Sequence, residues 1–304
     1  MMLRRLAASL LALALASGAP AALGQAEDPA PLLLTGTLAK ARASGAVTLA
    51  FRESSIPFSF LSPRKEPIGY SIELCKKLAE AIGAAVGKEL AIRWLAVTAE
   101  TRIDAIASGR ADLECGSTTD NLERRKLVAF SPTVFVAGTR LLVRKGSPIR
   151  SFRDLGGRTI VVTAGTTNEK AMHEIARRFR LDFKLATARD HAESYAQLEA
   201  GGADAFATDD VLLFGLVAQH KAHDKYQVVG EFLSYDPYGI MFRKDDLQLA
   251  AVVKQAFHDL AEDGEVERQY KRWFLRRLPS GESLDLPMSP QLETLIRAMA
   301  AKPE

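Results

Sequence analysis

An arginine and two hydroxyl-rich turns have the residue types and spacing that suit the binding of a small carboxylate. Arg52 directly follows the apolar run 46–51. Its guanidinium offers a planar pair of donors to a carboxylate, and a surface ion pair with Glu53 is the competing interpretation. The turns 116–119 and 165–167 each follow a strand-like run and precede a helix-like run. Their hydroxyl and backbone N–H groups suit an anion, or they simply cap the helices.

Motifs that would indicate an enzyme or a metal site do not occur in the sequence. There is no G-x-S-x-G motif around Ser117, no H-E-x-x-H among the five histidines, and no glycine-rich phosphate loop. We therefore expect no catalytic residue, no cofactor and no metal ion. Lys and Arg number 40 against 37 Asp and Glu, and this near balance also predicts no binding to nucleic acid.

Strand-like and helix-like runs alternate along the chain from about residue 46. The predicted strands are 46–51, 90–95, 111–115, 140–143, 159–163, 205–207 and 239–242. The predicted helices are 71–83, 102–108, 168–179, 191–200, 210–220 and 248–274. This alternation predicts an α/β fold with mostly parallel sheets, which bind ligands beyond the carboxyl ends of their strands.

Two passages repeat the same order of helix, glycine, aspartate and strand. They are 102–114 and 195–206, and each leads to a polar cluster, at 116–120 and at 208–210. Two such strand ends in two halves of the chain favour two lobes with a cleft between them. A single doubly wound domain with a coincidental local similarity is the alternative.

The first 24 residues have the layout of a secretory signal peptide. Arg4 and Arg5 precede the apolar run 6–16, and small residues follow it. Eleven residues at about 1.5 Å each cannot cross a hydrocarbon layer about 30 Å thick, so a membrane anchor is disfavoured. We expect export to the periplasm, after which the loss of two arginines changes the net charge from +3 to +1.

Cys75 and Cys115 are the two cysteines of the chain. In an oxidising compartment they could form a disulfide bond, or they could pack as two buried thiols. The sequence does not give the Cα separation that would distinguish these alternatives.

Eight short segments of the chain, in order, resemble the bacterial periplasmic amino-acid-binding proteins of ABC transporters. The segments are FRESSIPF at 51–58, GYSIEL at 69–74, ECGSTTDNLERR at 114–125, AFS at 129–131, VVTAGTT at 161–167, DH at 190–191, TDD at 208–210 and YG at 238–239. The resemblance is to family 3 of the bacterial solute-binding proteins, and it is strongest to the glutamate/aspartate-binding branch.

This resemblance implies a periplasmic-binding-protein type II fold, in which two α/β lobes joined by two hinge strands close around a ligand cleft. Lobe 1 would comprise 45–137 plus 238–275, and lobe 2 would comprise 140–235. The tail, 276–304, would carry a helix that packs on lobe 1, and residues 1–24 would be removed as the signal peptide.

The resemblance also implies a site that binds both main-chain charges of an amino acid. Arg124 would grip the α-carboxylate, and Asp209 would bind the α-ammonium group. Hydroxyl and backbone groups would complete the contacts with these two charges, from Ser117, Thr119, Thr166 and Thr167.

The side-chain carboxylate of the ligand would lie among Arg52, Arg102 and His191. A neutral or basic side chain there would leave buried charges unpaired, so the implied ligands are L-glutamate and L-aspartate. Glutamine or asparagine would fit if His191 is neutral. Ala99 departs from the branch, whose members carry serine at this position. The resemblance thus implies one hydroxyl contact fewer, and it leaves the choice between glutamate and aspartate open.

The implied function is a receptor, active as a monomer, that hands its ligand to the permease subunits of an ABC transporter. Sequences of this type do not distinguish delivery to a permease from delivery to a chemoreceptor. The alternative is an enzyme on the same fold, a periplasmic cyclohexadienyl dehydratase, for which Glu53 or His191 would be the general acid.

Overall fold

The computed structural model describes residues 33–301 of the chain. The predicted signal peptide, residues 1–24, lies outside the described residues. No helix within residues 33–301 is both long enough and apolar enough to span a bilayer.

The first of two five-stranded sheets is mixed, and its central strand is β6. Its order is β5 (Ala91–Ala96), β1 (Ala46–Phe51), β6 (Leu113–Glu114), β15 (Met241–Arg243) and β7 (Val128–Phe130). β1 runs parallel to β5 and β6, whereas β15 runs antiparallel to β6 and β7. The carboxyl ends of β1 and β6 therefore point to the same edge of this sheet.

Helix α2 (Tyr70–Val86) covers part of this sheet because its apolar residues recur at helical spacing. Ile72, Cys75, Leu78 and Ile82 are fully buried. The structure joins Cys75 to Cys115 in a disulfide bond, with the two Cα atoms 6.0 Å apart. The disulfide thus ties α2 to the residue that directly follows β6.

The remaining helices on this side differ from the prediction in two places. The structure adds α1 (Gly36–Ser44), which the sequence analysis did not predict. The single predicted helix 248–274 is wrong, because α7 (Leu247–Glu262) ends and α8 (Glu265–Phe274) begins after a turn at Gly264. Gly264 has φ +68°, a left-handed conformation that interrupts a helix and that glycine adopts readily. Helix α9 (Pro290–Ala300) packs against α7.

The second sheet has the order β11 (Lys184–Ala188), β10 (Thr159–Thr163), β12 (Ala205–Asp209), β9 (Thr139–Arg144) and β13 (Tyr226–Val229). Its parallel strands are joined by helices, as βαβ units require. The helices are α4 (Thr167–Phe179), α5 (His191–Glu199) and α6 (Asp210–Gln219), and a short helix α3 (Arg102–Ala107) belongs to the first sheet.

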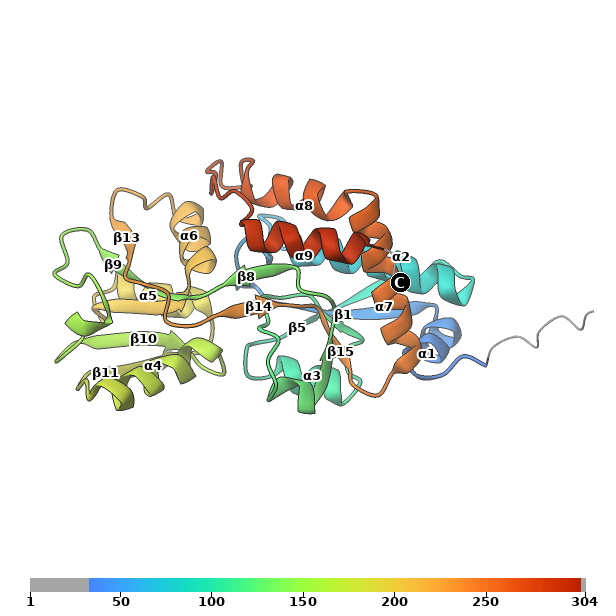
Figure 1. The fold of residues 1–304 in the computed structure, drawn as a ribbon, viewed down its shortest axis with the longest axis horizontal. Helices are drawn as coiled ribbons and strands as arrows, with labels where there is room; N and C mark the ends of the chain where they lie inside the picture. The colour runs from blue at the N-terminus through green and yellow to red at the C-terminus, as the bar shows by residue number, and fades with distance from the viewer. Residues whose placement is uncertain (1–32, 302–304) are drawn as a thin grey trace, which may run out of the picture. The chain divides into compact units, whose positions relative to one another are not determined.

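Two antiparallel strands connect the sheets, β8 (Phe135–Ala137) and β14 (Asp236–Tyr238). Figure 1 shows them side by side between the sheet that contains β1 and the sheet that contains β10. The two-lobed α/β fold predicted from the sequence is confirmed by these two sheets and the paired connection between them.

Aromatic side chains pack at the base of this connection. The ring of Phe58 lies 5.0 Å from that of Phe135 on β8 and 5.1 Å from that of Tyr238 on β14, centroid to centroid. Phe58 lies in the turn between the short strands β2 (Ser54–Ser55) and β3 (Ser59–Leu61). Edge-to-face packing of this kind anchors both connecting strands to the first sheet.

Candidate functional site

The nine residues predicted from the sequence all lie at ends of secondary-structure elements. Arg52 follows β1, Arg102 opens α3, Ser117 and Thr119 follow β6, Arg124 opens the short helix Arg124–Lys126, Thr166 and Thr167 begin α4, His191 opens α5, and Asp209 ends β12. Eight of them are buried, and Thr167 is half-buried. The ends of strands and helices carry backbone groups without partners, and at these ends an open α/β sheet can hold a polar ligand.

The guanidinium group of Arg52 is buried. Arg52 is 1% exposed, and neither of its terminal nitrogens has a partner within residues 33–301. Burial and the neighbouring charge of Arg102 lower the pKa of Arg52 to about 10. Two buried cations that repel each other and have unpaired N–H donors form a site for an anion.

Arg102 is held by a buried acid that the sequence analysis did not identify. Arg102 Nη1 donates to Thr118 Oγ1 at 2.6 Å, and Thr118 Oγ1 donates to Glu114 Oε2 at 2.7 Å. Burial lowers the pKa of Arg102, and the negative charge of Glu114 opposes that effect. A Cβ atom on Gly116 would lie 2.2 Å from Glu114 Oε1, so the glycine leaves the space that this carboxylate occupies.

The imidazole of His191 lies among the same charges. Its Nδ1 is 2.8 Å from Thr163 Oγ1, at the end of β10. Burial, together with Arg52 and Arg102, holds the pKa of His191 well below its usual value. The ring is therefore neutral at neutral pH in this structure, and the two arginines supply the positive charge.

Asp209 forms the negative pole of the site. Its carboxylate accepts a hydrogen bond from Asn168 Nδ2 at 2.7 Å and another from the Tyr238 hydroxyl. Burial and the nearby Asp236 raise the pKa of Asp209 to about 7, although these two hydrogen bonds act in the opposite direction. A cation placed beside Asp209 would favour its ionised form.

Arg124 and Thr119 contact each other, and Thr119 also contacts Asp236. Arg124 Nη1 donates to the backbone oxygen of Thr119 at 2.8 Å, and Thr119 Oγ1 donates to Asp236 Oδ1 at 3.0 Å. Burial and Arg102 lower the pKa of Arg124 to about 9. The structure thus brings Arg52, Arg102 and Arg124 into one cluster with buried acids around it.

Thr166 caps helix α4 with its hydroxyl group. Its hydroxyl donates to Thr163 O at 2.7 Å and accepts from Glu169 N at 3.2 Å, which caps α4. The first N–H groups of α4 have no partner within the helix itself. Thr167 differs, because its hydroxyl lies 3.2 Å from Thr119 Oγ1.

Sequence reasoning missed three buried polar residues of the cluster: Glu114, Asn168 and Asp236. Each had a partial signal, since Glu114 ends a strand beside the hydroxyl-rich turn, Asn168 follows Thr167, and Asp236 lies between the predicted end of lobe 2 and the second part of lobe 1. Polar residues at strand ends are common, and only the packed structure shows that these three contact the cluster.

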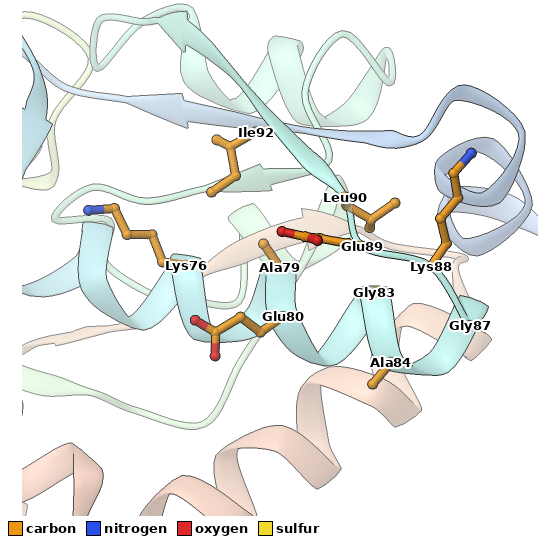
Figure 2. Close-up of a pocket in the computed structure, with 10 residues that line it drawn as sticks. All are labelled: Lys76, Ala79, Glu80, Gly83, Ala84, Gly87, Lys88, Glu89, Leu90 and Ile92. Carbon is orange, nitrogen blue, oxygen red and sulfur yellow. The ribbon is translucent and has the colours of Figure 1, made fainter.

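A small cavity of about 140 Å³ lies beside Arg52, lined also by Glu53, Thr98, Thr101 and Asp190. The side chain of Glu53 is exposed there. A different hollow, of about 610 Å³, lies along α2 and the turn into β5 (Figure 2). Lys76, Glu80 and Glu89 border it, and it contains none of the nine predicted residues.

The chain is similar in sequence to known solute-binding proteins. The profile of the bacterial extracellular solute-binding proteins, family 3, matches residues 47–276. The L-glutamate/L-aspartate-binding protein of Pseudomonas aeruginosa is 41% identical over 301 residues, which cover 98% of each chain. The glutamate/aspartate import solute-binding protein of Escherichia coli is 36% identical over 299 residues, covering 98% of this chain and 97% of that protein.

Solved structures share the fold at lower identity. A mutant of ArgBP from T. maritima superposes with a TM-score of 0.71 at 23% identity, covering 79% of this chain and 100% of that one. The ancestral amino-acid-binding protein AncCDT-1, a precursor of cyclohexadienyl dehydratase, has a TM-score of 0.69 at 28% identity, with 78% and 99% of the two chains covered.

Proposed function

Because the chain belongs to the bacterial extracellular solute-binding proteins, family 3, we propose that it is a receptor for L-glutamate and L-aspartate. The relatives named for these two ligands are similar over nearly their whole length, which supports the same ligands here. In this proposal the protein is exported to the periplasm, acts as a monomer, and delivers its ligand to the permease subunits of an ABC importer.

The observation that carries the proposal is the unpartnered guanidinium of Arg52 beside Arg102. A carboxylate between them would accept from both arginines and cancel their mutual repulsion. Each charge-assisted hydrogen bond contributes roughly 1.5–3 kcal/mol. A ligand that lacks this carboxylate would leave the repulsion in place, which favours acidic side chains over neutral ones.

The rest of the cluster matches the zwitterionic end of an amino acid. Arg124 offers donors to the α-carboxylate, and Asp209 offers an acceptor to the α-ammonium group. The ammonium group would also offset the electrostatic cost of two neighbouring buried acids, Asp209 and Asp236. The ligand thus supplies the opposite charge at each end of the site.

We propose that ligand contacts stabilise a closed arrangement of two lobes, residues 45–137 with 238–275 and residues 140–235. Several contacts already join these parts in the structure, among them the hydrogen bond from Tyr238 to Asp209. Thr119 and Thr167 share a hydrogen bond, and Lys170 Nζ lies 2.6 Å from Glu123 Oε2. A ligand held by Arg124 and by the start of α4 would add contacts to both sides, and differential contacts of this kind shift a conformational equilibrium.

Calorimetric titration with glutamate, aspartate, glutamine and asparagine tests the proposal. We expect the acidic ligands to bind more tightly than their amides in the unmodified protein. Arg52→Ala should weaken glutamate binding roughly 10- to 100-fold, because about 1.5–3 kcal/mol is lost. Arg64→Ala, which removes an exposed arginine, is the matched control and should leave binding unchanged. Equal affinity for all four ligands would contradict the proposal.

The proposed receptor performs no chemical step, and an enzyme assay tests this part separately. Of the two residues considered as a general acid, Glu53 is exposed, and His191 is neutral in the ligand-free protein through burial and two arginines. A dehydratase needs a group that donates a proton at the working pH. Consumption of prephenate or arogenate by the purified protein would overturn the assignment as a receptor without catalytic activity.

A further inference from the structure

His191 is the last member of a chain of three hydrogen bonds. His191 Nδ1 lies 2.8 Å from Thr163 Oγ1, Thr163 Oγ1 lies 2.9 Å from Ser194 Oγ, and Ser194 Oγ donates to the backbone oxygen of Asp190 at 3.0 Å. All three side chains are buried, so no bulk water competes for these contacts. The direction of each bond follows from the number of protons available.

Only one arrangement of the protons satisfies all three hydrogen bonds. The Asp190 carbonyl has no proton, so the single hydroxyl proton of Ser194 is used there. Thr163 must then donate its own proton to Ser194, which leaves Thr163 Oγ1 as an acceptor toward His191. The proton between Thr163 and the imidazole therefore belongs to Nδ1, and a neutral ring carries a lone pair on Nε2.

Nε2 lies on the side of the ring away from Thr163, and the charges near the ring are positive. Arg52, from the end of β1, and Arg102, from α3, both act on His191. Asp190, the preceding residue on its own helix, accepts from Glu193 N at 2.9 Å and pairs with Arg189. Strands β2, β10, β11 and β12 also pack against this helix. The other titratable or charged groups that contact it do so away from the ring: His220 stacks on Tyr195, and Arg144 donates to the backbone oxygens of Leu198 and Glu199 at the far end of the helix.

Building on the proposed function, we propose that the Thr163–Ser194 pair fixes His191 as the Nδ1–H tautomer, so that a ligand carboxylate binds there together with one proton. The unprotonated Nε2 repels a carboxylate. One proton from the solvent adds to Nε2, which then donates to the ligand oxygen, and no other bond changes. Thr163 and Ser194 are positioning residues in this scheme, because neither has to touch the ligand.

The proton taken up at Nε2 makes the preference for glutamate over glutamine depend on pH. The amide nitrogen of glutamine can donate to the Nε2 lone pair directly, so its binding needs no proton at this position. Glutamate binding should therefore weaken about tenfold per pH unit relative to glutamine once the pH exceeds the pKa of His191 in the ligand-free protein, up to the higher pKa that His191 has in the complex. Protons exchanged at Asp209 cancel in this comparison, because both ligands carry the same ammonium group.

Nitrogen NMR of the ligand-free protein tests the tautomer without any ligand. Long-range proton–nitrogen correlation spectra should show His191 with a protonated Nδ1 and an unprotonated Nε2. Ser194→Ala frees the Thr163 proton to bond to Nδ1 and should convert the ring to the Nε2–H tautomer. An Nε2–H ring in the unmodified protein would overturn the proposal, and so would a Ser194→Ala spectrum that is identical to it. This measurement stands even if the ligand assignment fails.

Calorimetry in buffers of different ionisation enthalpy tests whether a proton is taken up when the ligand binds. Glutamate binding near pH 7 should take up about one proton more than glutamine binding. In Ser194→Ala the difference should fall toward zero, since a neutral Nε2–H already serves the carboxylate. Thr163→Val, a second variant that removes the acceptor for Nδ1–H, should reduce the difference as well. Where the protein binds no glutamine, glutamate uptake is compared between the unmodified protein and His191→Gln.

His173→Gln is the matched control, because His173 is exposed on α4 and should leave the proton count unchanged. An equal proton count for glutamate and glutamine in the unmodified protein contradicts the proposal. Failure to bind either ligand would instead contradict the proposed function, and the NMR measurement would then decide the tautomer alone.

Discussion

The hydroxyl oxygens of Thr119 and Thr167 lie 3.2 Å apart, which joins the segment after β6 to the first residue of α4. Thr119 uses its own proton on Asp236 Oδ1, so Thr167 is the donor in this pair. The bond between these threonines therefore also reaches β14, one of the two connecting strands. A contact of this kind is made only when the two sheets approach each other.

Thr119→Val should weaken glutamate binding roughly 30-fold, because two hydrogen bonds that accompany the approach of the two sheets are lost. One net hydrogen bond contributes about 1 kcal/mol. Titration calorimetry measures the effect. Thr294→Val, which removes an exposed hydroxyl on α9, is the control and should leave the affinity unchanged. Unaltered binding by Thr119→Val would show that this contact does not accompany ligand binding.

Gly165→Ala should obstruct the approach of α4 to the turn before α3. A Cβ atom on Gly165 would lie 2.8 Å from Glu100 Cγ and 3.0 Å from Glu100 Cα, and the residue has φ +74°. We expect a folded protein whose affinity for glutamate falls by at least about tenfold, a loss of about 1.4 kcal/mol. Small-angle scattering with saturating glutamate should also show a larger radius than the unmodified protein shows.

Gly157→Ala separates backbone strain from the steric effect of Gly165→Ala. Gly157 has φ +68°, but nothing lies within 4 Å of a Cβ atom placed there. Its substitution should lower stability by roughly 1–2 kcal/mol and leave binding unchanged. If both alanine variants bind glutamate equally well, close approach at Gly165 is not required for binding.

Asp209 should make the ligand-free protein less stable as the pH rises. Its folded pKa of about 7 lies above the ordinary value of 3.8, so between these values the folded state holds a proton that the unfolded chain has lost. The free energy of unfolding therefore falls between about pH 4 and pH 7. Asp209→Asn should reduce this fall in urea titrations at a series of pH values.

The same substitution should weaken ligand binding, because an amide cannot neutralise the ammonium group. Binding of glutamine, which involves no proton at His191, should weaken as the pH falls below about 7 and Asp209 becomes protonated. Asp182→Asn, at an exposed position, serves as the control for both measurements. A stability profile of Asp209→Asn that matches the unmodified protein would contradict this assignment.

Reduction of the disulfide between Cys75 and Cys115 should lower stability. The bond closes a loop across 40 residues of sequence, and removing such a constraint costs about 2–4 kcal/mol of unfolding free energy. Urea unfolding with and without reductant measures the loss. The double variant Cys75→Ser, Cys115→Ser should match the reduced protein and show no response to reductant. Equal stability of the oxidised and reduced proteins would contradict the prediction.

Local patterns in the sequence predicted the elements well where the physical cause is local. Apolar spacing predicted α2, and the strand 46–51 is found as β1 with the same bounds. The division of the predicted helix 248–274 was not recognised, because apolar spacing continues through it and only the backbone angle of Gly264 marks the turn. The choice between a disulfide and two thiols needed the separation of the two Cα atoms.

The site shows the same division between local and distant causes. The sequence placed Arg52 and the two hydroxyl-rich turns at ends of elements, and the structure brings these ends together. The sequence could not show that Glu114 contacts Arg102 through Thr118, or that burial makes His191 neutral. Charge states depend on which groups surround a side chain, and that is known only after packing.

The sequence alone therefore determined the types of residues available, the alternation of strands and helices, and the edges at which polar groups emerge. These follow from periodicity and from glycine positions within a few residues. The tertiary structure alone decided which cations share one buried volume, which acid each of them faces, and which proton each hydroxyl gives. Those outcomes depend on dielectric environment and on distances between segments far apart in the chain, and neither is a local property.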